Sequence, residues 1–132
     1  MKGQEARDQG PGEQGAKPLS AGLRPPAPGP EEFLSYLQVE RRMSAHTLDA
    51  YRRDLAALAQ WCGEQGAGEA QALATEQLRA FIAAGHRRGL SPRSLQRRLS
   101  AIRSFYAWLL KNGAIGSSPA AGLRAPKAPR KL

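Results

Sequence analysis

Hydrophobic residues recur at helical spacing in four stretches of this 132-residue chain, and no stretch has the alternating pattern of a strand. The first stretch begins after Pro30, and the second begins at Ser44, a good N-cap residue. The third begins at Thr75, interpreted as an N-cap, and the fourth at Ser91, which is followed by proline. The pattern predicts an all-α fold, a small four-helix bundle.

The two ends of the chain lack this periodicity. Residues 1–30 are rich in Gly, Pro, Gln and Ala, and we predict a disordered extension; the alternative is a start codon assigned too early. Residues 31–122 form the predicted helical domain, with one short turn at 119–122. Residues 123–132 are basic and contain prolines, which is typical of a linker that leads to another domain.

The fourth stretch divides into two faces when its residues are placed about 100° apart. One face is apolar and is predicted to lie in the core: Leu95, Leu99, Ile102, Tyr106 and Leu109. The opposite face, here called the arginine arc, consists of Arg93, Gln96, Arg97, Ser100, Arg103 and Ser104. Arg98 flanks the apolar face, where its methylenes could pack or its charge could be paired within the fold.

The charge distribution changes the interpretation of this arc. Residues 77–132 contain 12 Lys/Arg and no Asp/Glu, so no acidic partner is available within the helix. Solvated helix faces usually mix the two signs, whereas an unmixed arginine face favours a polyanion, since the guanidinium fork suits phosphate and guanine. We therefore predict nucleic-acid binding; a solvated face and an anionic membrane surface remain the alternatives.

The second stretch offers a smaller polar surface. His46 and Arg53 lie opposite its apolar residues, which include Leu55, Leu58 and Ala59, while Thr47 and Arg52 border them. The free N–H groups at the start of this helix form a potential phosphate site. The alternative is an ordinary capped helix.

No catalytic or metal-binding pattern is evident. The two histidines lack metal-ligand spacing, and the single cysteine, Cys62, falls among apolar residues, which indicates a buried inert thiol. Asp54 is predicted to pair with a nearby arginine, and the tyrosines to pack in or near the core. We expect no cofactor or metal, no membrane span and a cytoplasmic location.

Three ordered segments resemble the N-terminal core-binding domain of Xer-type tyrosine recombinases: "YLQVERRMSAHTLDAYRRDLAALAQWC", "GLSPRSLQRRLSAIRSFYAWLLKNG" and "SPAAGLRAPKAPRKL". The pieces "HTLDAYRRDL" and "GLRAPKAPRKL" are more similar to the XerC branch than to the XerD branch. The resemblance covers residues 31–132. It implies a SAM-like four-helix bundle that forms one half of a clamp round duplex DNA.

In such clamps the second and fourth helices cross in the major groove. The resemblance therefore implies DNA contacts from His46, Thr47, Arg52 and Arg53, and from Arg93, Ser94, Gln96, Arg97, Ser100 and Arg103. Arg124, Lys127, Arg130 and Lys131 would follow the DNA backbone towards the catalytic domain, whose tyrosine nucleophile and partner residues have no counterpart in this sequence. The chain is thus expected to bind DNA without cutting it.

By the same resemblance, the full protein would resolve chromosome dimers before cell division. It would act on double-stranded DNA with a XerD-like partner recombinase in a heterotetramer, under control of a DNA translocase. One alternative is the core-binding domain of a mobile-element integrase. Another, of a different class, is a helical adaptor whose basic face binds an acidic protein.

Overall fold

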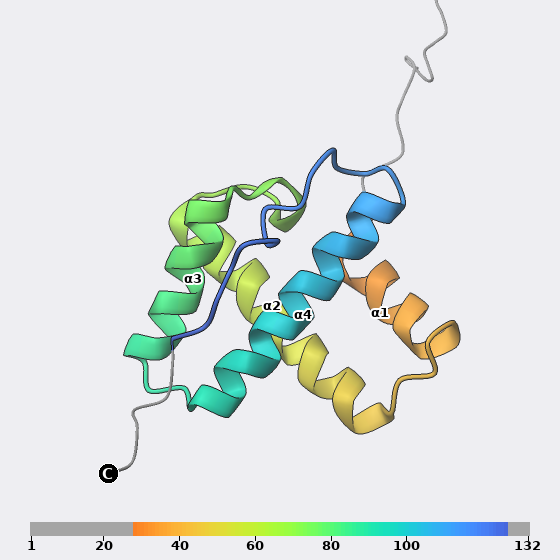
Figure 1. Cartoon of the computed structure of the whole chain (residues 1–132), viewed down its shortest axis with the longest axis horizontal. Helices are drawn as coiled ribbons and strands as arrows, with labels where there is room; N and C mark the ends of the chain where they lie inside the picture. Colours follow the sequence, from red (N-terminus) through yellow and green to blue (C-terminus); the bar gives the residue numbers. More distant parts are fainter. Residues whose placement is uncertain (1–27, 127–132) are drawn as a thin grey trace, which may run out of the picture.

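A computed structural model describes residues 28–126, which contain four α-helices and no strand (Figure 1). The helices are α1 (Pro30–Val39), α2 (Ala45–Gln65), α3 (Thr75–Arg87) and α4 (Pro92–Lys111), and a short 3-10 helix, η1 (Ala70–Ala72), precedes α3. The predicted all-α bundle is confirmed. Most of the predicted N-terminal extension lies outside the described residues, but Pro30 is already the first residue of α1.

The apolar face of α4 is the centre of the core. α4 packs against α1, α2 and α3, and Leu95, Leu99, Ile102, Tyr106 and Leu109 are all buried, as the periodicity predicts. On α2 the apolar face is shifted slightly from the prediction, because Ala50 is buried and Ala59 is exposed. Within residues 28–126, no helix is long and apolar enough to cross a bilayer.

α2 and α4 begin with the same capping arrangement. The Ser44 hydroxyl accepts a hydrogen bond from the Thr47 amide at 3.2 Å, and the Ser91 hydroxyl accepts one from the Ser94 amide at 3.1 Å. Both predicted N-caps are confirmed. Each cap satisfies an amide that would otherwise lack a partner in the first helical turn.

The predicted N-cap of α3 is wrong by one residue. Ala74 occupies the cap position, and Thr75 is the first helical residue. The Thr75 hydroxyl donates instead to the carbonyl oxygen of Pro119 at 2.8 Å, because the C-terminal segment lies over the start of α3. The Ala74 amide is satisfied by the side chain of Gln77 at 2.8 Å.

The segment after α4 returns along the bundle. Gly113 turns the chain with a φ of 74°, and the predicted turn at 119–122 is present. Figure 1 shows this segment running between α3 and α4 towards the end where α3 stops and α4 starts. Leu123, the first residue of the predicted linker, is buried in the core, and its carbonyl oxygen accepts a hydrogen bond from the Arg103 guanidinium.

The 3-10 helix η1 was not predicted. The phenol of Tyr106, in the middle of the core, donates a hydrogen bond to the carbonyl oxygen of Ala70, the first residue of η1. Ala70 and Leu73 are buried beside it. Contacts between distant parts of the chain therefore order a stretch whose glycine-rich sequence indicates only a loop.

Candidate nucleic-acid interface

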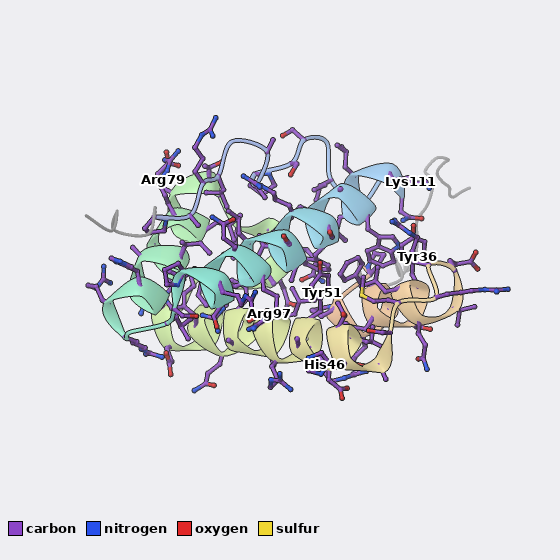
Figure 2. The ribbon with its side chains drawn as sticks, turned by 60° about the horizontal axis from the view of Figure 1, so that its bottom comes forward. Tyr36, His46, Tyr51, Arg79, Arg97 and Lys111 are labelled. Carbon is purple, nitrogen blue, oxygen red and sulfur yellow. The ribbon has the colours of Figure 1, made fainter. Side chains whose placement is uncertain are left out.

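The polar faces of α2 and α4 lie side by side. The two helices pack against each other, and Figure 2 shows Arg97 between them and His46 at the start of α2. Most of the predicted DNA-contacting residues in these helices are exposed: His46, Arg52, Arg53, Arg93, Gln96, Ser100 and Arg103. Thr47, Ser94 and Arg97 are partly buried.

Arg97 is paired with an acidic residue of the neighbouring helix. Its Nε donates to Oδ2 of Asp54 at 2.8 Å, and its Nη2 donates to Oδ1 at 3.0 Å. The Asp54 side chain is 1% exposed and that of Arg97 is 36% exposed. This hydrogen-bonded carboxylate raises the pKa of Arg97 above its ordinary value, so the guanidinium is permanently charged.

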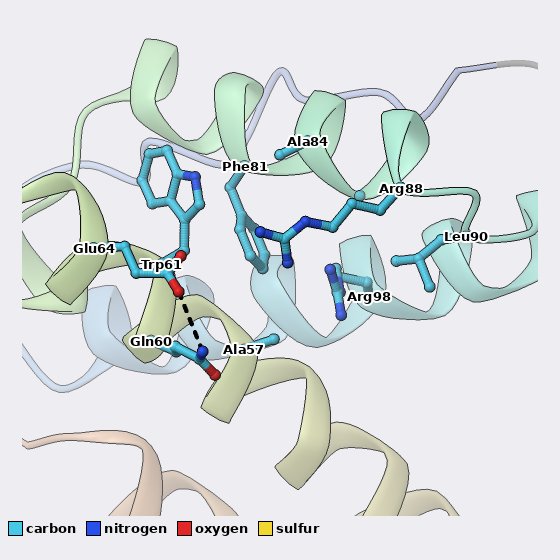
Figure 3. Close-up of a pocket in the computed structure, with 10 residues that line it drawn as sticks. Ala57, Gln60, Trp61, Glu64, Phe81, Ala84, Arg88, Leu90 and Arg98 are labelled. Atoms are coloured by element: carbon cyan, nitrogen blue, oxygen red, sulfur yellow. Dashed lines mark hydrogen bonds between the residues drawn. The ribbon is translucent and has the colours of Figure 1, made fainter.

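Arg98 shares the same carboxylate from a more buried position. Its Nε lies 3.3 Å from Oδ1 of Asp54, and its guanidinium carbon lies 4.9 Å from the centre of the Phe81 ring. Figure 3 shows Arg98 beside Phe81 and Leu90 at a small pocket that Trp61 also lines. Arg98 is therefore both packed and paired within the fold, the two possibilities that the sequence left open for it.

These contacts give the arginines of α4 an acidic partner from another helix. No acidic residue occurs within α4 itself, because residues 77–132 contain no Asp/Glu. Asp54 of α2 supplies that partner for Arg97 and Arg98. The predicted pairing of Asp54 with an arginine is confirmed.

Two further arginines of the predicted site make contacts within the protein. Arg52 Nη1 lies 3.1 Å from a carboxylate oxygen of Glu31 in α1, and both side chains are well exposed. Such a surface pair contributes little stability and dissociates easily when a phosphate competes for the guanidinium. Arg103 Nη2 donates a hydrogen bond to the carbonyl oxygen of Leu123, which attaches the returning C-terminal segment to α4.

The other basic residues of the predicted site have no partner within residues 28–126. Neither a hydrogen bond nor an ion pair involves the side chains of Arg53, Arg93 and Arg124 in that part of the chain, and all three are exposed. Their charges are thus available to an external anion. Lys127, Arg130 and Lys131 lie outside the described residues.

Thr47 and Ser94 hold equivalent places at the starts of α2 and α4. The hydroxyl of each accepts a hydrogen bond from the capping serine, at 3.0 Å from Ser44 and 3.1 Å from Ser91. Their own hydroxyl hydrogens are therefore left to donate outwards. A hydroxyl donor next to a helix N-terminus is a common contact for a phosphate oxygen.

Asp54 lies at this surface but is not among the DNA-contacting residues predicted from the sequence. A signal for it exists in the sequence, because Asp54 lies one helical turn after Tyr51 and one before Leu58, on the face of α2 that carries the core residues. A lone acidic residue there requires a cationic partner. The basic fourth helix is the obvious source.

Cys62 and Tyr106, two potential nucleophiles, serve packing. Cys62 is a free, buried thiol, and burial, with a smaller effect of Glu69, raises its pKa, which opposes formation of the reactive thiolate. Burial also raises the pKa of Tyr106, whose hydroxyl is already bonded to Ala70. The predicted packing roles of these two residues are confirmed.

Comparison with known proteins gives a consistent picture. The chain is 69% identical over 102 residues to the tyrosine recombinase XerC of Xanthomonas campestris pv. campestris (strain B100), and 65% identical over 102 residues to that of Xylella fastidiosa (strain M23). Identity to the XerC protein of Pseudomonas aeruginosa (strain LESB58) is 49% over 102 residues. Each alignment covers 77% of this chain.

The chain spans about a third of the length of these relatives, between 32% and 35%. No solved structure matches it significantly. Residues 31–113 match the family model described as the phage integrase N-terminal SAM-like domain. That match covers more than half of the chain and all four helices except Pro30, the first residue of α1, so the chain belongs to the family of phage integrase N-terminal SAM-like domains.

Proposed function

We propose that this chain is the DNA-binding N-terminal domain of a site-specific tyrosine recombinase of the XerC type. The observation that carries the proposal is the arginine arc of α4, which lies beside the polar face of α2 and contains Arg93, exposed and without a partner in residues 28–126. A helix face of this kind suits the major groove, with phosphate contacts that position the protein and base contacts that give specificity. The names of the relatives support the same function.

In the full protein this domain forms one half of a clamp round duplex DNA. Strand cleavage and rejoining belong to the part of the relatives that this chain does not match. The whole enzyme works in the cytoplasm with a XerD-like recombinase at a chromosomal site and resolves chromosome dimers under control of a DNA translocase. The linker proposed for residues 123–132 then starts from a fixed point, because Leu123 is buried.

Fluorescence anisotropy with a labelled duplex oligonucleotide tests the DNA-binding function. The chain should bind duplex DNA at low salt, and the logarithm of its affinity should fall linearly with the logarithm of salt concentration, by about 0.9 for each phosphate contact. Arg93→Ala should weaken binding several-fold. If Arg93 contacts a phosphate, the salt slope should also decrease by about 0.9.

Arg79→Ala is the matched control. Arg79 is also an exposed arginine, but it lies on α3, away from Arg97, and its Nη1 is 3.8 Å from Glu76 (Figure 2). This variant loses the same charge and should keep near wild-type affinity. No duplex binding at low salt would contradict the proposed function, and equal losses in the two variants would contradict the placement of the interface on α4.

A further inference from the structure

Asp54 is the one fully buried charged residue in the part of the chain that the structure describes. Removing a carboxylate from water is costly, and a buried ion pair can often be replaced by apolar residues without loss of stability. Stability of the α2–α4 contact alone therefore does not require an aspartate at this position. Its geometry indicates another role.

The carboxylate holds Arg97 at two points. The bonds from Nε (2.8 Å) and Nη2 (3.0 Å) fix the plane of the guanidinium as well as its position. The carboxylate is in turn fixed by Arg98, whose guanidinium is packed over Phe81. Arg97 thus projects from a rigid support that joins α2, α3 and α4.

The two hydrogen bonds to Asp54, here called the fork, occupy only one edge of the Arg97 guanidinium. An arginine carries five N–H groups, and those outside the fork have no partner within residues 28–126. The side chain is 36% exposed, so the unoccupied edge is accessible from solvent. A flexible arginine loses rotamer entropy when it binds a ligand, whereas Arg97 is already ordered.

We propose that Asp54 is a positioning residue for DNA recognition, which holds Arg97 so that its free edge donates to an acceptor atom of duplex DNA. This inference rests on the proposed DNA-binding function and adds a residue that does not itself contact the DNA. It predicts a change in DNA affinity opposite to the one expected from the net charge of the chain. Replacing Asp54 by a neutral residue makes the chain more positive, yet it should weaken binding to a polyanion.

The test compares Asp54→Asn with Glu64→Gln in anisotropy titrations with a fluorescein-labelled duplex of mixed sequence. Both variants change a carboxylate of α2 to an amide, but Glu64 is exposed, and its one hydrogen-bond partner among the described residues is Gln60, at 3.2 Å. Asp54→Asn should bind about tenfold more weakly than wild type, the size expected for one ordered charge-assisted contact. Glu64→Gln should bind as tightly as wild type or slightly more tightly.

The same pair of measurements in an Arg97→Ala background separates positioning from a general structural effect. If Asp54 acts through Arg97, Asp54→Asn should cause no further loss there. An equal loss in both backgrounds would overturn the proposal, as would wild-type or tighter binding by Asp54→Asn alone. Failure of the wild-type chain to bind duplex DNA would instead remove the proposed function itself.

A second variant keeps the proposal testable if circular dichroism shows that Asp54→Asn does not fold. Arg97→Lys retains the positive charge and leaves Asp54 paired with Arg98, but a lysine cannot form the two-point fork. It should bind the same duplex several-fold more weakly than wild type. Wild-type affinity of Arg97→Lys would overturn the proposal.

Discussion

Tyr106 combines a packing role with one specific polar contact. Its ring is fully buried next to Phe105, at a centroid distance of 5.2 Å, and its hydroxyl reaches the carbonyl oxygen of Ala70. Among the described residues, the other donor to the Ala70 carbonyl is the amide of Leu73, at 3.5 Å. The phenol therefore satisfies a backbone acceptor that would otherwise be poorly paired inside the protein.

Tyr106→Phe should lower the free energy of unfolding by about 1–2 kcal/mol, because it removes the hydrogen bond and leaves the buried Ala70 carbonyl with only the long bond from the Leu73 amide. Urea denaturation followed by circular dichroism measures the change. Tyr51→Phe is the control, since the half-buried Tyr51 phenol makes no hydrogen bond within residues 28–126. Equal midpoints for the two variants would show that the bond to Ala70 contributes nothing.

The arginines show what sequence periodicity can and cannot predict about single residues. It correctly assigned Leu95 and Leu99 to the core and identified Arg98 as a residue between the two faces. It did not distinguish Arg93 from Arg97, which share the arc but differ in partners. That difference depends on which residue of α2 lies opposite, and such a contact between helices is not encoded in the spacing within one helix.

Helix boundaries were predictable where the capping residue acts locally. Ser44 and Ser91 bond to amides three residues away, so the information lies in a short stretch of sequence. The N-cap of α3 was predicted one residue late, because the Thr75 hydroxyl bonds to Pro119, 44 residues away, and does not cap the helix. The short helix η1 was missed for the same reason, since its carbonyl is satisfied by Tyr106 of α4.

The segment that follows α4 is predicted to be part of the folded unit up to Leu123. Leu123→Ala should destabilise the chain by about 3 kcal/mol, because Leu123 is buried and truncation leaves a cavity in the core. Thermal denaturation followed by circular dichroism measures this loss. Leu110→Ala removes the same atoms from a side chain that is 42% exposed, and should cost about 0.5 kcal/mol or less.

Equal stability of these two leucine variants would mean that residues 114–123 are only loosely attached in solution. The sequence places residues up to 122 in the helical domain but predicts only one short turn there, because this stretch has glycine, proline and serine and little apolar periodicity. The structure holds it by two buried side chains near its end, Ala120 and Leu123, together with a hydrogen bond from Arg103.

All four helices and the returning segment share one hydrophobic core, which extends from Phe33 of α1 to Leu123. A single core predicts that the domain unfolds in one cooperative transition. The two tryptophans report on different regions, since Trp61 contacts Phe81 of α3 with ring centroids 5.8 Å apart, and Trp108 contacts Phe33 of α1 at 5.6 Å.

Single-tryptophan variants can test this cooperativity. In Trp61→Phe the fluorescence reports on the α1–α4 contact, and in Trp108→Phe it reports on the α2–α3 contact. Within each variant, the urea transition seen by fluorescence should coincide with that seen by circular dichroism. A fluorescence transition at lower urea in Trp108→Phe would contradict a single unit and would show that α3 separates first.

The returning segment also determines where the chain leaves the domain. α4 has 20 residues and is therefore about 30 Å long, so a chain that left directly from its C-terminus would emerge far from Arg93. Residues 114–123 cover that distance while packed, and the chain emerges beyond Leu123, towards the end where α4 begins (Figure 1). The linker that remains after Leu123 is then shorter. A shorter linker confines an attached group to a smaller volume, so the effective concentration of that group near the arginine arc is higher.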